Sequence, residues 1–135
     1  MPRPPSGVYE TILYSEDIPG AVAFYGDVLG LSSIDVLGDI GAGFRLQSGA
    51  MLLIFDPRKS SVPGRPAPSH GTAGAGHIAF QVDGTQIASW RAHFRELGIE
   101  IEKDNTSDNG AQQLYVRDPA GNSVEIVAGE LWPKA

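Results

Sequence analysis

The clearest structural signal in this chain is the stretch Leu114-Tyr-Val-Arg-Asp-Pro-Ala-Gly-Asn-Ser-Val-Glu-Ile-Val-Ala-Gly129. Residues 113–117 and 123–127 are rich in apolar and β-branched residues, and the Asp-Pro-Ala-Gly sequence at 118–121 is typical of a tight turn. The pattern predicts two short strands joined by that turn. Glu125 places a charge inside the second strand. Its carboxylate lies either on the solvent side of a half-buried strand or in a cavity that holds a positive group.

The first half of the chain is predicted to form a strand, a helix and three further strands. Residues 8–14 alternate in polarity, so they indicate a strand with Glu10 and Tyr14 on one face. A cap residue and an early proline at 15–19 begin the helix, and Gly30 ends it. The further strands are expected at 34–37, 44–47 and 51–55, the last one apolar on both faces.

The second half repeats this order after a segment that is rich in proline, glycine and serine. That segment, residues 57–75, is predicted to be a linker or a mobile loop. Asp83 and Gln86 resemble a capping box, and the apolar residues Ile87, Trp90, Phe94 and Leu97 then recur at helical spacing. Strands are expected at 76–82, 99–102, 113–117 and 123–127.

The two halves match each other at specific positions. Leu29-Gly-Leu31 corresponds to Leu97-Gly-Ile99 after the helices, and Glu10 corresponds to His77 in the opening strands. Internal repetition of this length indicates two βαβββ modules related by an approximate two-fold axis. We therefore predict an α+β fold in one domain, residues 1–135, with modules at about 8–56 and 76–128. The sheets should form an open, curved, mixed surface with the helices outside.

The composition limits the classes of function. The chain has 135 residues, of which 41% are hydrophobic, so it is long enough to bury a core. Its net charge of −6 disfavours nucleic acids and anionic membranes as partners. The lack of cysteine excludes disulfides, thiolate nucleophiles and Cys-ligated zinc. Because no stretch resembles a signal peptide or a membrane span, we expect a soluble, cytoplasmic protein.

Three polar residues stand in otherwise apolar predicted strands, namely Glu10, His77 and Glu125. If the two modules curl their sheets around one surface, these side chains converge on one point. Two carboxylates and a neutral imidazole suit a divalent ion such as Fe, Mn, Ni, Co or Zn. No compact metal-binding motif is present. The residue pattern alone therefore also allows solvated strand carboxylates and a hydrogen-bonded core histidine.

Four runs of sequence, in the right order along nearly the whole chain, resemble one known family. The runs are Glu10-Thr-Ile-Leu-Tyr-Ser-Glu-Asp17, Ala23-Phe-Tyr-Gly-Asp-Val-Leu-Gly30, Gly76-His-Ile-Ala-Phe80 and Tyr115-Val-Arg-Asp-Pro-Ala-Gly-Asn-Ser-Val-Glu125. They are similar to those of the glyoxalase/bleomycin-resistance/extradiol-dioxygenase family, the vicinal oxygen chelate superfamily. The resemblance implies paired βαβββ modules, a homodimer, and a divalent metal ion that binds a substrate through adjacent oxygens.

The resemblance also implies positions for the metal ligands. The first falls on Glu10, the second on His77 and the third on Glu125. Two departures stand out, because many relatives have histidine at the first position, and the additional acidic ligand of glyoxalase I falls near Leu53, which binds no metal. These departures weaken a strict assignment as glyoxalase I or as a standard iron dioxygenase.

The leading hypothesis is a small metal-dependent enzyme in which the ion acts as a Lewis acid on a small oxygen-chelating substrate, with lyase, isomerase or dioxygenase chemistry. Glu125 or Glu10 would also move a proton. The alternative is a non-catalytic homodimer of the bleomycin-resistance type that binds a drug or metabolite.

Four other residues have aromatic or imidazole side chains for which the sequence suggests a role. Tyr115 is a candidate substrate contact, and Trp132 either docks on a partner subunit or caps a pocket. His70 lies in the 57–75 segment, which either covers a cleft or connects the modules. His93 is expected on the surface of its helix.

Overall fold

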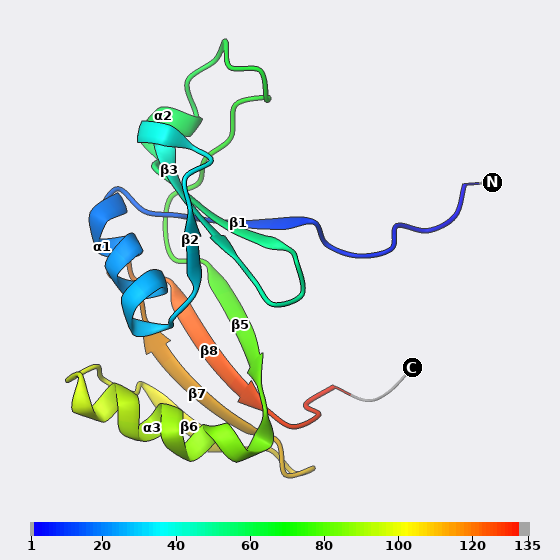
Figure 1. The fold of residues 1–135 in the computed structure, drawn as a ribbon, viewed down its shortest axis with the longest axis vertical. Helices are drawn as coiled ribbons and strands as arrows, with labels where there is room; N and C mark the ends of the chain where they lie inside the picture. The colour runs from blue at the N-terminus through cyan, green and yellow to red at the C-terminus, as the bar shows by residue number, and fades with distance from the viewer. Residues whose placement is uncertain (1, 133–135) are drawn as a thin grey trace. The chain divides into compact units, whose positions relative to one another are not determined.

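The computed structural model describes residues 2–132. Its contacts divide the chain into two compact units, unit 1 (residues 1–74) and unit 2 (residues 75–135), and each is described by itself. Both units contain a four-stranded mixed sheet (Figure 1). None of the helices within the described residues is long and apolar enough to cross a membrane.

Unit 1 is built as a strand, a helical segment and three strands. The sheet has the order β1-β4-β3-β2, in which β1 runs parallel to β4 and the other neighbours are antiparallel. Its elements are β1 (Glu10–Tyr14), α1 (Ile18–Val22) continuing as η1 (Ala23–Val28), β2 (Ser32–Ile34), η2 (Gly38–Ile40), β3 (Gly41–Arg45), β4 (Met51–Phe55) and α2 (Pro57–Ser60).

Strand β4 is the centre of the unit 1 core. All five of its residues are buried, which confirms the prediction of a strand that is apolar on both faces. Tyr25 of η1 is fully buried and its ring lies 5.7 Å from that of Phe44 in β3. Met51, Leu53 and Phe55 form a second apolar cluster, against which Ile12, Tyr14, Ile34, Leu37 and Ile40 pack.

Unit 2 repeats the arrangement of unit 1. Its sheet has the order β5-β8-β7-β6, again with the first pair parallel and the others antiparallel. Its elements are β5 (His77–Val82), η3 (Gly84–Gln86), α3 (Ile87–Glu96), β6 (Lys103–Thr106), β7 (Gln112–Arg117) and β8 (Ser123–Ala128). The predicted α+β class, with paired βαβββ modules and open sheets, is confirmed.

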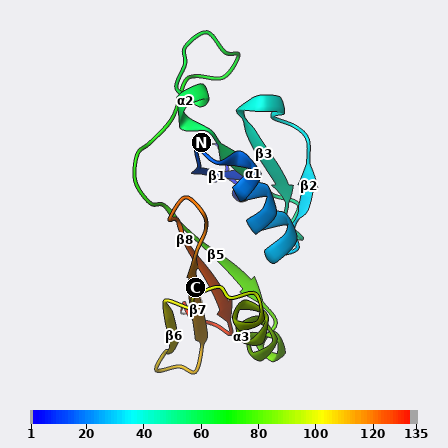
Figure 2. The same cartoon turned by 90° about the vertical axis from the view of Figure 1, so that its left-hand side faces the viewer.

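Helix α3 lies along one face of the unit 2 sheet (Figure 2). Ile87 and Phe94 of this helix are buried, as are Val124 and Ile126 of β8. Because side chains alternate along a strand, Glu125 between them belongs to the opposite, open face. The helix therefore covers the apolar face and leaves a face with polar side chains available for a site.

Three predicted strands differ in position from the observed ones. The strand expected at 34–37 is β2 at 32–34, and Leu37 beyond it packs on the apolar cluster of unit 1. The strand expected at 44–47 is β3 at 41–45. The strand expected at 99–102 is β6 at 103–106, whose four residues are all exposed. An exposed edge strand of polar residues carries no apolar alternation, so periodicity could not locate it.

The start and the end of α3 also differ in detail from the prediction. Asp83 accepts a hydrogen bond from the backbone N–H of Thr85, but this caps η3 rather than α3. Gln86 precedes α3 directly and makes no side-chain capping bond. Leu97, expected in the apolar stripe, lies just beyond the helix and is 50% exposed. The short 3₁₀ turn takes up the cap residues that the sequence suggested for the helix itself.

The 57–75 segment begins with helix α2 and then continues without regular structure. Its His70 contacts unit 1, since Nδ1 lies 2.7 Å from the Tyr14 hydroxyl. The ring of His70 also packs edge-on against that of Phe55, with the centroids 4.7 Å apart. The hydroxyl of Ser60 donates to the His70 carbonyl oxygen at 2.7 Å. His70 thus attaches this segment to the end of the unit 1 sheet.

Candidate functional site

The candidate site lies on the open face of the unit 2 sheet. His77 is the first residue of β5, and Glu125 is paired with Ala79 on β5 and with Tyr115 on β7. His77, Tyr115 and Glu125 thus come from three adjacent strands, although the first and the last of them lie 48 positions apart in the sequence. Strand pairing therefore brings together side chains that lie far apart in the sequence.

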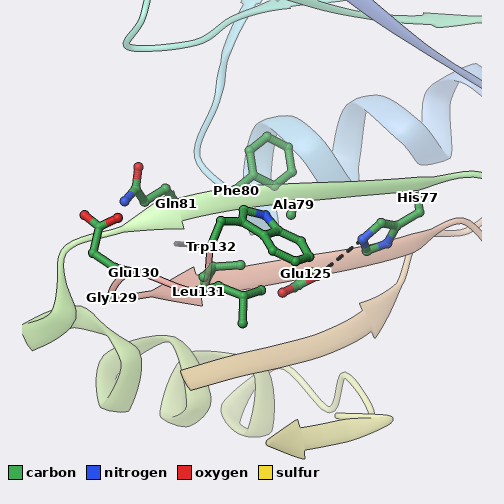
Figure 3. A pocket seen from close by; sticks show the side chains of 10 residues that line it. His77, Ala79, Phe80, Gln81, Glu125, Gly129, Glu130, Leu131 and Trp132 are labelled. Atoms are coloured by element: carbon green, nitrogen blue, oxygen red, sulfur yellow. Dashed lines mark ion pairs between the residues drawn. The ribbon is translucent and has the colours of Figure 1, made fainter. Parts of the chain in front are cut away.

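His77 and Glu125 approach each other directly (Figure 3). Nε2 of His77 lies 3.3 Å from Oε1 of Glu125, and Nδ1 lies 3.2 Å from the carbonyl oxygen of Ser123. A carbonyl oxygen only accepts hydrogen bonds, so Nδ1 carries the hydrogen in that contact. In a neutral imidazole, Nε2 then turns a lone pair toward the carboxylate. Two acceptors face each other, and a proton or a cation is needed between them.

The second oxygen of Glu125 strengthens the case for a cation. Glu125 is only 5% exposed, and its Oε2 is buried with no hydrogen-bond partner among the described residues. Burying a carboxylate oxygen without a donor is costly, so such an atom requires an explanation. An imidazole nitrogen and carboxylate oxygens are donors that first-row divalent metals accept. His77 and Glu125 therefore fit part of the coordination sphere of a divalent metal ion.

Tyr115 completes the polar group around Glu125. Its ring stacks on that of His77 with the centroids 6.3 Å apart and the planes 23° from parallel. Burial of the phenol, and then the negative charge of Glu125 and a hydrogen bond with it, raise the pKa of Tyr115 above its usual value. The phenol is therefore protonated at neutral pH and is able to donate to Glu125.

The turn between β7 and β8 positions His77. Asp118 Oδ1 accepts hydrogen bonds from the backbone N–H groups of Ala120 and Asn122, at 3.0 and 2.8 Å. The side-chain oxygen of Asn122 in turn accepts from the N–H of Gly76 at 2.7 Å. Because Gly76 directly precedes His77, the turn fixes the start of β5 beside the start of β8. The Asp-Pro-Ala-Gly-Asn turn thus connects β7 to β8 and also fixes the position of His77.

A pocket of about 470 Å³ opens beside the His77–Glu125 pair. Figure 3 shows the His77–Glu125 pair together with residues 129–132, which follow β8. The lining residues come from β5, β8 and that segment, and they are His77, Ala79, Phe80, Gln81, Glu125, Val127, Gly129, Glu130, Leu131 and Trp132. The pair is therefore accessible to a small molecule from this pocket.

The equivalent positions of unit 1 lack this chemistry. Glu10 opens β1 as His77 opens β5. Leu53 on β4 pairs with the third residue of β1, as Glu125 on β8 pairs with the third residue of β5. Leu53 also pairs with Gly43, where Glu125 pairs with Tyr115. The register thus places Leu53 at the position equivalent to Glu125, in accord with the position expected for the missing acidic ligand.

The structure brings two of the three predicted ligands together. His77 and Glu125 meet in unit 2, whereas Glu10 belongs to unit 1, where it is exposed on the edge strand β1. Within residues 2–132, no group of three or more His, Asp or Glu side chains is arranged to hold a metal ion. The three-residue site therefore stays a prediction.

Sequence reasoning missed the part of the pocket formed after β8. Gly129, Glu130 and Leu131 were not singled out, although they line the pocket. Periodicity carries no information about a short irregular segment. The one usable signal was Gly129 directly after a predicted strand, since such a glycine marks a sharp change of chain direction.

The comparisons with known proteins agree with this architecture. The family model of the Glyoxalase/Bleomycin resistance protein/Dioxygenase superfamily matches residues 8–126. The crystal structure of Lactoylglutathione lyase from Agrobacterium tumefaciens is 41% identical with a TM-score of 0.90, covering 98% of this chain and 100% of that chain. A glyoxalase/dioxygenase from Nostoc punctiforme is 25% identical with a TM-score of 0.71, covering 93% of this chain and 92% of that one.

A curated relative gives the same result at lower similarity. Virulence protein STM3117 of Salmonella typhimurium is 27% identical over 124 residues, which are 85% of this chain and 78% of that protein. Both the family match and the 41% identity extend over most of the sequence. The chain therefore belongs to the Glyoxalase/Bleomycin resistance protein/Dioxygenase superfamily.

Proposed function

We propose that this protein is a metal-dependent lyase that acts on a small substrate with adjacent oxygen donors. The observation that carries the proposal is the 3.3 Å approach of His77 Nε2 to Glu125 Oε1, beside a buried and unpartnered Glu125 Oε2. The name of the neighbour that is 41% identical supports lyase chemistry over isomerase or dioxygenase chemistry. A divalent ion held there would act as a Lewis acid toward substrate oxygens.

Glu10 is the proposed third ligand, supplied by the same chain or by the second copy in a homodimer. Support comes from the register, because Glu10 and His77 are the first residues of equivalent strands. Two carboxylates and one neutral imidazole would balance the charge of a divalent ion and leave positions for substrate. Fe, Mn, Ni, Co and Zn all accept such a donor set.

Glu10 and Glu125 differ in their freedom to move, and this suggests different roles. Glu125 is buried in the centre of the sheet between β5 and β7, whereas Glu10 is exposed on an edge strand. A carboxylate that takes a proton from carbon has to reach the substrate and then withdraw. We therefore assign proton transfer to Glu10 and a fixed, cation-holding role to Glu125. Tyr115 stays protonated and holds the Glu125 carboxylate in place.

Metal titration of the metal-free protein tests the proposal. Isothermal titration with Mn, Fe, Co, Ni and Zn should show stoichiometric binding to the natural protein. Glu125→Gln and His77→Ala should lose it, and Glu10→Gln should weaken it. Glu96→Gln and His93→Ala, in helix α3 of the same unit, serve as matched controls and should bind normally. If no ion binds the natural protein, the proposal of a metal-dependent enzyme is wrong, and a binding protein of the same fold is favoured.

A further inference from the structure

The segment after β8 turns back to line the pocket. β8 ends at Ala128, and Gly129 has a φ of +95°, a conformation that residues with side chains rarely adopt. A side chain at position 129 would also approach the Cα atom of Ala111 to 3.3 Å. The positive φ and this tight contact both favour glycine here. The turn directs residues 130–132 along the pocket rather than away from it.

Asn109 holds this segment in place. Its Oδ1 accepts hydrogen bonds from the Ala111 N–H at 3.1 Å and from the Ser107 hydroxyl at 2.6 Å. These donors fix the orientation of the amide, so its nitrogen faces the other way. That nitrogen donates to the carbonyl oxygens of Glu130 at 2.6 Å and Leu131 at 3.4 Å. The position of Trp132 is thus set by a side chain from the loop before β7.

Trp132 occupies an unusual place for so large an apolar side chain. It is 77% exposed, yet it lines the same pocket as the buried Glu125 (Figure 3). An indole face stacks well on another flat ring and attracts cations. Leaving its apolar surface exposed to water, as here, is unfavourable. A ligand in the pocket would cover this face. Glu125 Oε2, buried and unpartnered, also indicates that the pocket receives a ligand.

The charge of the pocket limits the ligand further. Glu125 and Glu130 are both acidic, and none of the lining residues that the structure describes is lysine or arginine. In the metal-free protein an anionic ligand would be repelled, because this set contains no lysine or arginine to compensate. A neutral or cationic flat ring suits this pocket well.

We propose that Trp132 determines the specificity of the site by stacking on a flat, neutral or cationic ring of the substrate, and that Asn109 positions it. This inference rests on the proposed function only in taking the pocket beside His77 and Glu125 as the substrate site. It adds the shape and the charge of the group that this substrate carries. Trp132 acts on substrate binding and takes no part in metal binding or proton transfer.

Tryptophan fluorescence tests the inference directly. The chain has two tryptophans, so Trp90→Phe leaves Trp132 as the single emitter. Three probes with the same ring and different charge, benzamidine, benzamide and benzoate, are titrated into this variant in the presence of EDTA. Benzamidine and benzamide should quench or shift the emission in a saturable way, and benzoate should not. If Trp90→Phe folds poorly, the difference in emission between the natural protein and Trp132→Phe reports the same indole.

Variants then separate stacking from simple bulk. By calorimetry, Trp132→Phe should keep most of the benzamidine affinity, whereas Trp132→Leu should lose roughly three- to tenfold, the usual range for an aromatic pair. Asn109→Ala should weaken binding less than Trp132→Leu, because it loosens the segment without removing the ring. Asn105→Ala, at an exposed position of β6, is the matched control and should bind like the natural protein.

Three results would overturn the inference. They are the absence of any response to benzamidine and benzamide, equal affinity for benzoate, or an emission spectrum that depends on protein concentration because Trp132 packs on a second copy. The test is independent of the proposed metal, since EDTA is present throughout. If the protein binds the ring probes but no metal ion, only the proposed lyase function is contradicted. If the protein binds a metal ion but none of the ring probes, only the proposed role of Trp132 is contradicted.

Discussion

His77 and Glu125 form an arrangement that is unfavourable without a third partner. Their nearest atoms, Nε2 and Oε1, are 3.3 Å apart, and in a neutral imidazole the contact of His77 Nδ1 with the Ser123 carbonyl leaves Nε2 as an acceptor. Groups that are poorly matched in the free protein and well matched with a ligand are common at functional sites. The pair should therefore lower the stability of the metal-free protein.

Glu125→Gln is expected to stabilise the protein when no metal is present. The amide removes the buried charge and offers a hydrogen to His77 Nε2, so the free energy of unfolding should rise by about 1 kcal/mol. Urea denaturation in EDTA measures this difference. Glu96→Gln, exposed on α3, should leave the unfolding free energy unchanged. A Glu125→Gln variant that is less stable than the natural protein in EDTA would contradict the prediction.

Tyr115 is expected to ionise at higher pH than an exposed tyrosine. Burial, the charge of Glu125 and the hydrogen bond with it all raise its pKa, so the folded state binds the phenol proton more tightly than the unfolded state. The stability linked to this proton is complete below the ordinary tyrosine pKa of about 10 and is lost as pH rises through the folded value. Absorbance titration, with Tyr115→Phe to identify the phenol, follows the ionisation.

The Glu125→Gln variant tests how much Glu125 contributes to the raised pKa of Tyr115. Because burial is the first cause and Glu125 the second, this variant should move the pKa of Tyr115 only part of the way back toward 10. A complete return would show that burial contributes nothing, and no movement would show that the two side chains do not interact.

The strands with an apolar pattern were predictable from the sequence, and the exposed ones were not. β4 was located at its observed bounds because five consecutive apolar residues are buried on both faces. β6 was misplaced because its residues, Lys103 to Thr106, are polar and exposed. Its position depends on pairing with β7, in which Lys103 is opposite Tyr115. A tertiary pairing of this kind leaves no signal in local periodicity.

The internal repeat located two of the candidate site residues at equivalent strand positions. The match of Glu10 with His77 followed from the offset between the halves, and both residues do open equivalent strands. The contact between His77 and Glu125 required the register of β5 against β8, which the sequence does not contain. The roles of Asn109 and Gly129 depend on a loop that meets the segment after β8, so no pattern within either stretch could reveal them.

Asp104→Asn is expected to weaken unit 2 in a pH-dependent manner. Arg91 of α3 donates two hydrogen bonds to the Asp104 carboxylate of β6, at 2.7 and 3.0 Å, and the Arg91 hydrogen bond is the main cause that lowers the pKa of Asp104. The pair is partly exposed, so the loss at neutral pH should be only about 0.5 kcal/mol.

The sign of the pH effect follows from the lowered pKa. The contribution of Asp104 is present above its unfolded pKa of about 3.9 and is lost as pH falls through the lower folded value. Urea denaturation at pH 7 and at pH 3 should therefore show the difference between the natural protein and Asp104→Asn shrinking in acid. Glu102→Gln breaks a similar but more exposed pair with Arg117 and should have a smaller effect at pH 7. An Asp104→Asn effect that grows in acid would contradict the assignment.

Gly129→Ala is expected to lower both the stability and the affinity for flat rings. An alanine at a φ of +95° is strained, and its Cβ would lie 3.3 Å from Ala111 Cα, so the loss should be about 1–2 kcal/mol. The control is Gly84→Ala, because Gly84 has no positive φ and no atom within 4 Å of an added Cβ. Urea denaturation and benzamidine titration of both variants measure the two effects. If Gly129→Ala loses stability but binds benzamidine like Gly84→Ala, the turn supports the fold without setting the position of Trp132.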